Sequence, residues 1–182
     1  GYWQIKIYNS VQPAWVRPII EEAHRHGMSV TGHVPAYMTP DQAIEWGYRD
    51  IAHINQLMLG WLAPGEDTRT TIRLTAMARA AELDLSSAPV QHTIELMGAH
   101  GTSLDTTAVA LELLMLSRAG RTPPTHAYNL DHMPIGYQRY RKRTFVPIAD
   151  TQEDERYQRA FERLLQTLRL LHERSVQLLP GT

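Results

Sequence analysis

The 182-residue sequence contains no cysteine, and this absence removes two kinds of site at once. Without cysteine the chain can form neither a disulfide framework nor a thiolate metal site. Any metal ion that it binds must therefore be held by nitrogen and oxygen ligands. The nine histidines of the chain are a generous supply of such nitrogens.

An excess of charge of either sign and a long apolar run are also missing. The 18 basic and 19 acidic residues give a formal net charge of −1, so electrostatics offers no argument for a nucleic-acid or membrane partner. No run of about 18 apolar residues is present, and no segment is predicted to span a bilayer. The sequence does not begin with Met, so the lack of a secretory pattern at its start leaves the localisation open.

Two short segments rich in β-branched residues each carry a histidine near their C-terminal end. They are Met-Ser-Val-Thr-Gly-His-Val-Pro at residues 28–35 and Asp-Ile-Ala-His-Ile-Asn at residues 50–55. Because side chains alternate along a strand, Thr31 and His33 are predicted to share one face, as are Ile51 and His53. Two parallel strands joined by a helix would bring both histidines to one rim of a sheet, where α/β barrels hold their reacting groups.

The segment between these two strands has the pattern of a short helix. Thr39 and Gln42 have the spacing of a capping box, and Pro40 occupies the first helical position. Gly47 follows where a helix would end.

A third residue of interest is Lys6, within Ile-Lys-Ile-Tyr at residues 5–8. Ile5 and Ile7 are predicted on one face of a strand over residues 3–8, with Lys6 and Tyr8 on the other. A lysine that points into a barrel must be neutralised, paired or modified, because a buried bare ammonium group is costly. Taken alone, the strand favours a lysine at a sheet edge that reaches water.

The remaining chain continues the alternation of strands and helices. Two further strands are predicted over residues 102–106, with Ser103 and Asp105 on the face opposite Leu104, and over residues 176–180. The predicted helices cover residues 13–27, 39–47, 70–82, 89–100, 109–118 and a long apolar stripe within residues 152–171. The apolar segment 55–61 is expected to pack over the mouth of the sheet. All five strands are expected to be parallel, in an α/β fold.

The order lysine, histidine, histidine on three successive strands resembles the amidohydrolase superfamily, and its imidazolonepropionase-like and prolidase-like members in particular. The matching words are Ile-Lys-Ile-Tyr, Gly-His-Val-Pro and Ala-His-Ile-Asn. The resemblance implies a partial TIM-type (β/α)8 barrel in which residues 1–182 form strands four to eight of one domain. It also implies a binuclear metal centre in which Lys6, as a carbamate, bridges two ions while His33 and His53 bind one of them.

The resemblance further implies ligands beyond both ends of the sequence. In the family, strand one carries a His-x-His pair, whereas residues 24–26 here, His-Arg-His, fall in a predicted helix. Strand eight of the family ends in an aspartate that is metal ligand and general base, and its expected position follows Thr182. We therefore expect a fragment that is inactive alone and that needs the remaining barrel segments of its parent chain.

The reaction implied is the hydrolysis of an amide, a cyclic amide or a related C–N bond in a small-molecule or peptide-like substrate. Zinc is the default metal for nitrogen and carboxylate-type ligands, with manganese, cobalt and nickel as open alternatives. The predicted substrate-contacting residues, all near strand ends, are Tyr8, Tyr37, Asn55 and Asp105. The other class of function considered is a non-catalytic α/β domain in which Lys6, His33 and His53 only hydrogen-bond to one another.

Residues 120–150 break the alternation with turn-forming sequences. A long excursion of this kind near a barrel mouth is typical of a lid or a substrate-selecting loop. His132 would then be within reach of substrate, although a plain loop histidine is the favoured interpretation of this residue. Tyr-Gln-Arg-Tyr-Arg-Lys-Arg at residues 137–143 mixes basic and aromatic side chains. As a nucleic-acid site this segment is short, and the slightly acidic chain around it argues against that interpretation.

Overall fold

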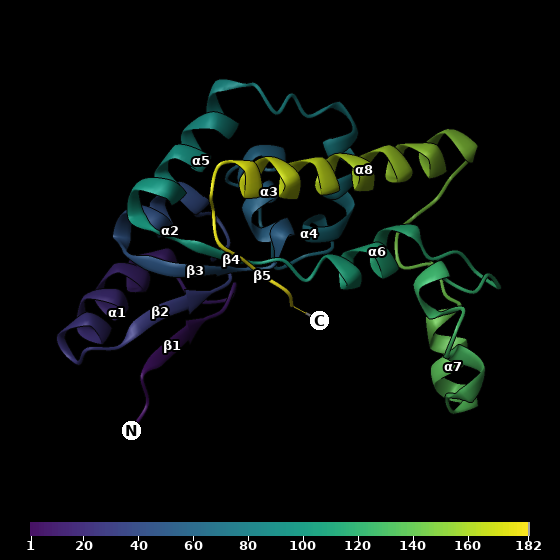
Figure 1. Cartoon of the computed structure of the whole chain (residues 1–182), viewed down its shortest axis with the longest axis horizontal. Coiled ribbons are helices and arrows are strands. Elements are labelled where there is room, and N and C mark those ends of the chain that lie inside the picture. The colour runs from purple at the N-terminus through teal and green to yellow at the C-terminus, as the bar shows by residue number, and fades with distance from the viewer. Residues whose placement is uncertain (182) are drawn as a thin grey trace.

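The computed structural model describes residues 1–181 and contains a sheet of five strands in the order β1-β2-β3-β4-β5 (Figure 1). Each strand pairs in parallel with the next. The strands are β1 (Gln4–Ile7), β2 (Ser29–Gly32), β3 (Tyr48–Ala52), β4 (Ser103–Asp105) and β5 (Leu178–Leu179). The predicted parallel α/β architecture is confirmed, and it is compatible with part of a barrel. The numbering of these strands as four to eight stays a prediction.

Two helices connect the first three strands. Helix α1 (Pro13–Arg25) continues through Pro18 and buries Val16, Ile20 and Ala23 against the sheet. Helix α2 (Pro40–Trp46) begins with the predicted capping box: the Gln42 amide N–H donates to the Thr39 hydroxyl at 3.2 Å, and the Thr39 N–H donates to the Gln42 side chain at 3.0 Å. Gly47 ends α2 in a left-handed conformation, as its position predicted.

A larger helical layer separates β3 from β4. It comprises α3 (Ile54–Leu62), α4 (Ile72–Thr75), the 3-10 helix η1 (Ala76–Glu82) and α5 (Ala88–His100). The apolar segment 55–61 lies in α3, with residues 54–59 all buried. The single helix predicted over residues 70–82 is therefore divided, with one α-helical turn followed by a tighter 3-10 segment.

The C-terminal third contains α6 (Ala108–Leu116), the short 3-10 helices η2 (Pro124–His126) and η3 (Leu130–His132), α7 (Ile135–Arg141) and α8 (Thr151–Glu173). Helix α7 projects away from the sheet in Figure 1, and the role of residues 120–150 as a lid stays a prediction. Asp150 caps α8 by accepting the Glu153 N–H at 2.8 Å, and α8 packs mainly against η1. None of the helices described combines the length and the apolar character needed to cross a membrane.

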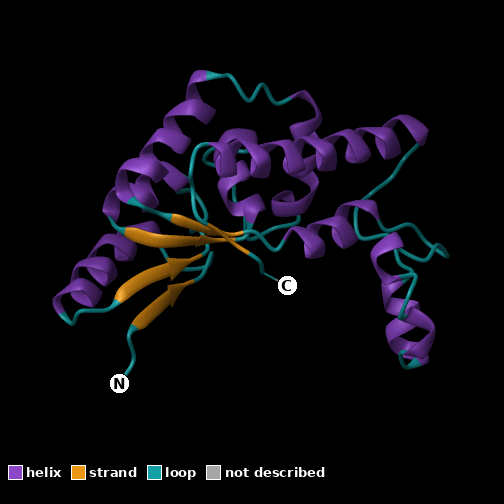
Figure 2. Cartoon of the chain, viewed as in Figure 1, coloured by secondary structure: helices purple, strands orange, loops and turns teal. Residues whose placement is uncertain are grey.

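The core lies between the sheet and its helices, which Figure 2 shows gathered against one face of the strands. The strand residues on the helix-covered face of the sheet belong to this core, and each is at most 2 % exposed: Ile7, Val30, Ile51 and Leu104. Each such side chain contributes about 1.5–3 kcal/mol on burial. The side chains that alternate with them, such as Lys6, Thr31 and Asp50, therefore lie on the opposite face of the sheet.

Gly32, the last residue of β2, gives a test of how closely β1 and β2 approach. Its φ is 129°, and a Cβ there would overlap the carbonyl oxygen of Ile7. We expect Gly32→Ala to lower the free energy of unfolding by roughly 2–4 kcal/mol, since strain and overpacking add. The measurement is urea denaturation followed by circular dichroism.

Gly98 is the matched control for this substitution. It lies in α5 with open space around the position of a Cβ. Gly98→Ala should therefore leave the free energy of unfolding unchanged or raise it by up to about 1 kcal/mol, because alanine favours the helix. Equal effects of the two substitutions would contradict the close approach at Gly32.

Candidate functional site

His33 and His53 meet at the C-terminal edge of the sheet. His33 directly follows β2 and His53 directly follows β3. The centroids of their rings are 4.7 Å apart, with the rings in an edge-to-face arrangement at 73°. The predicted convergence of the two side chains is confirmed, whereas their role as metal ligands stays a prediction.

The physical reason for this convergence differs from the alternation argument. Thr31 aligns with Asp50 across β2 and β3, so the face shared by Thr31 and His33 is the Asp50 face. Ile51 lies on the opposite face, fully buried among the helices. By alternation alone His53 would follow Ile51, but its φ of 74° interrupts the strand geometry and leaves its ring beside His33.

Each ring has a different set of neighbours. The Nδ1 atom of His53 shares a hydrogen bond of 2.7 Å with the Thr107 hydroxyl, which fixes the ring and leaves Nε2 outside that bond. The Nδ1 atom of His33 is buried and has no hydrogen-bond partner within residues 1–181. On its other side His33 stacks against Tyr8, with ring centroids 4.1 Å apart. The pair therefore presents nitrogen atoms that no described residue satisfies.

Burial favours the uncharged form of both imidazoles. It is the largest cause that lowers the pKa of His33 to about 4, and the neighbouring basic groups of His53, Lys6 and Arg73 lower it further. Burial also lowers the pKa of His53, although the carboxylate of Asp105 opposes that shift. Neutral imidazole is the form that binds a metal ion or accepts a proton.

Lys6 lies one strand away from the pair, and its side chain is exposed. It is close enough for its charge to lower the pKa of both histidines. Within residues 1–181 no hydrogen bond joins Lys6, His33 and His53 to one another, so nothing in the hydrogen bonding favours the purely structural alternative.

Asp50, for which the sequence predicted no role, lies beside the site, and its charge raises the pKa of His53. It aligns with Thr31 on one side and with Ser103 on the other, and both hydroxyls donate to its carboxylate, at 2.7 Å and 2.9 Å. Burial raises the pKa of Asp50, and these two hydrogen bonds oppose the rise. In the sequence, Asp50 and Ala52 alternate with Ile51. This pattern indicates that the Asp50 carboxylate lies on the face of β3 opposite the buried Ile51.

The predicted substrate contacts are divided between the site and its surroundings. Tyr8 and Asn55 line a cavity of about 290 Å³ together with both histidines. Tyr37 is instead held by Asp67, whose carboxylate accepts its hydroxyl at 3.1 Å, and it is not among the residues that line this cavity.

Asp105 of β4 also lies outside the residues that line the cavity, although its charge reaches His53. Its Oδ1 atom is buried without a hydrogen-bond partner among residues 1–181. Three further polar residues line the cavity and were not predicted: Gln56, Arg73 and Thr107. They come from α3, from α4 and from the start of α6. A search for polar residues at the ends of strands therefore would not have found them.

The donor atoms of this site fit part of a metal centre. A catalytic zinc site commonly has three protein ligands. Two imidazoles converge here, but residues 1–181 contain no group of three histidine, aspartate or glutamate side chains placed to hold an ion. His33 and His53 therefore fit as two ligands of a larger set.

The lowered pKa of His33 leads to a test in the metal-free protein. We expect its ring to stay uncharged until about pH 4, whereas an unfolded histidine takes up a proton near pH 6.5. The unfolded chain then binds more protons between these values, so this histidine makes the free energy of unfolding fall as the pH falls from 6.5 to about 4. Imidazole NMR titration measures the pKa, and His33→Gln should flatten the pH dependence of stability. A His33 ring that titrates near 6.5 would contradict the burial argument.

Comparison with known proteins gives a match in structure alone. No protein family model and no curated protein matches the sequence. The solved structure of bottromycin amidohydrolase matches all of this chain and 37 % of its own, with a TM-score of 0.58 and 20 % identity. A protein described as uncharacterized matches all of the chain and 34 % of its own, with a TM-score of 0.46 and 14 % identity.

The chain thus spans about a third of the length of the solved structures that it matches. The likeness to bottromycin amidohydrolase indicates an amidohydrolase-like fold, in agreement with five parallel strands and a site at their C-terminal edge. A likeness at 20 % identity concerns the fold alone.

Proposed function

We propose that this chain is part of a metal-dependent hydrolase that cleaves amide, cyclic amide or related C–N bonds. The observation that carries the proposal is the convergence of His33 and His53, two neutral imidazoles with unsatisfied nitrogen atoms at the C-terminal edge of a parallel sheet. The amidohydrolase-like fold supports the same reaction class.

In this proposal His33 and His53 hold one divalent ion, with zinc as the metal that suits nitrogen ligands best. A divalent ion at such a site supplies activation of water and polarisation of a carbonyl group. Thr107 positions His53, because its hydroxyl holds the Nδ1 atom and leaves Nε2 for the metal. Tyr8 covers the outer side of His33 and limits the access of water to that ring.

Lys6 and the rest of the parent protein complete the proposed site. A protonated lysine would repel cations, whereas its carbamate would be an anionic oxygen ligand able to bridge two ions. The other ligands and the general base are proposed to come from further barrel segments. The match to only 37 % of bottromycin amidohydrolase agrees with a larger parent fold.

The first test is zinc binding by residues 1–182, measured by calorimetry and by the imidazole NMR signals. We expect weak binding that shifts the signals of His33 and His53, and we expect His33→Ala or His53→Ala to weaken it at least about tenfold, because each removes one ligand. His92→Ala is the control, since His92 is an exposed residue of α5. Equal zinc binding by all three variants would contradict the assignment.

Thr107 provides a second test that leaves both proposed ligands in place. Thr107→Ala should weaken zinc binding roughly tenfold, the usual cost of losing a residue that orients a ligand. Thr107→Ser keeps the hydroxyl and should retain most of the affinity. If the two variants bind zinc equally, the hydrogen bond to His53 has no positioning role.

The third test concerns Lys6 in the complete parent protein, since we expect no hydrolysis from residues 1–182 alone. Lys6→Ala should abolish turnover there, because a bridging oxygen ligand is lost, and added bicarbonate or a short carboxylic acid should partly restore it. Hydrolysis of an amide substrate and the metal content are measured together. A parent protein that keeps both with alanine at position 6 would exclude the lysine from the site.

A further inference from the structure

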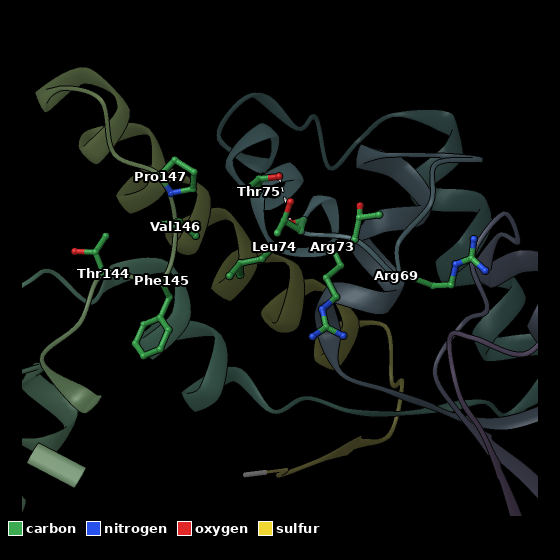
Figure 3. A pocket seen from close by; sticks show the side chains of 10 residues that line it. Arg69, Arg73, Leu74, Thr75, Thr144, Phe145, Val146 and Pro147 are labelled. Carbon is green, nitrogen blue, oxygen red and sulfur yellow. Dashed lines mark hydrogen bonds between the residues drawn. The ribbon is translucent and has the colours of Figure 1, made fainter. Parts of the chain in front are cut away.

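A second, larger cavity adjoins the histidine pair and has no part in the function proposed above. Its volume is about 750 Å³, and its walls come from residues 69–71, 73–75 and 144–147 (Figure 3). Arg73 and Leu74 line both this cavity and the one that contains His33 and His53, so the two cavities are neighbours. The larger cavity reaches from these two residues to the segment that follows α7.

Two arginines line the larger cavity, but only one of them is uncompensated. Arg69 donates to the Asp67 carboxylate through Nε and Nη2, both at 2.7 Å, and also contacts the Tyr37 hydroxyl at 3.3 Å. Arg73 forms no side-chain hydrogen bond or ion pair within residues 1–181, and Figure 3 shows its guanidinium extending into the opening between Arg69 and Phe145. Its positive charge also lowers the pKa of both histidines, so it acts on the same space.

The rest of the cavity wall offers little else for an ionic group. Leu74, Phe145, Val146 and Pro147 form an apolar surface. The hydroxyl of Thr75 donates to the Thr71 carbonyl at 3.3 Å, and that of Thr144 accepts the Ala119 N–H at 2.9 Å. One free guanidinium beside an apolar wall is complementary to a ligand with a single negative charge and an apolar group next to it.

We propose that Arg73 binds the carboxylate of an N-acyl amino acid or of a peptide C-terminus, with the apolar side chain of that residue against Phe145, Val146 and Pro147. The guanidinium fork matches a carboxylate in two parallel hydrogen bonds. A phosphate dianion would need a second cation, and Arg69 is already neutralised by Asp67. The placement of the amide bond of this ligand at His33 and His53 rests on the proposed function, whereas the carboxylate site does not.

The test compares N-acetyl-L-phenylalanine with N-acetyl-L-phenylalaninamide, which differ only in the carboxylate. Both are titrated into residues 1–182 with a metal chelator present, and binding is followed by backbone and arginine side-chain NMR signals. We expect the acid to bind about tenfold more tightly than the amide at low salt, and its advantage to shrink as ionic strength rises. The signal of the Arg73 side chain should move with the acid.

Arg73→Gln should remove the preference for the acid while leaving the weak binding of the amide. Arg17→Gln is the matched control, because it removes the same charge from α1, where Arg17 pairs with Glu21. Circular dichroism confirms that each variant is folded.

Equal binding of acid and amide by the wild-type chain, or a preference that survives in Arg73→Gln, would overturn the proposal. Tighter binding of phenyl phosphate than of the acid would overturn the choice of a carboxylate. Because the chelator removes metal, failure of zinc binding at His33 and His53 would leave this result unaffected. The two proposals can therefore fail separately.

Discussion

The left-handed backbone at His53 is the constraint on which the arrangement of the site depends. Its φ of 74° ends the alternation of β3 and leaves the ring 4.7 Å from that of His33. Thr107, the hydrogen-bond partner of His53, is also left-handed, with a φ of 41°. Such conformations cost about 1–3 kcal/mol each in residues other than glycine, and the surrounding core must offset this cost. The buried helices that begin beside these two residues, α3 and α6, provide that core.

Much of the fold is readable from local sequence because its signals are local. The β-branched segments give the strands, and the capping box of Thr39 and Gln42 gives the start of α2. The left-handed turn at His53 has no such signal, since histidine has no intrinsic preference that demands it, and simple alternation would have placed the ring among the helices. Thr107 was missed for a related reason: it lies 54 residues from His53 in the sequence and meets it through the pairing of β3 with β4.

Tyr37 shows the opposite outcome, in which a residue near a strand end lies outside the cavity. Its position soon after His33 suggested a substrate contact, but its hydroxyl is held by Asp67 and Arg69. That pairing joins residues about 30 positions apart, and no periodicity in the sequence encodes it. Asp50 differs from Tyr37 in that the sequence does hold a signal for it: Asp50 alternates with the buried Ile51, so its carboxylate must lie on the face of β3 opposite the helices.

The charges around the histidine pair explain how one site combines cations with neutral imidazoles. Lys6 and Arg73 lower the pKa of both rings, while Asp50 and Asp105 raise that of His53. The carboxylate of Asp50 is tied to Thr31 and Ser103 by two hydrogen bonds, so it stabilises the sheet and is not free to bind a ligand. The uncompensated charge at the cavity is therefore the guanidinium of Arg73. The cations of Lys6 and Arg73 thus favour the uncharged form of both rings, which is the form of imidazole that can bind a metal ion.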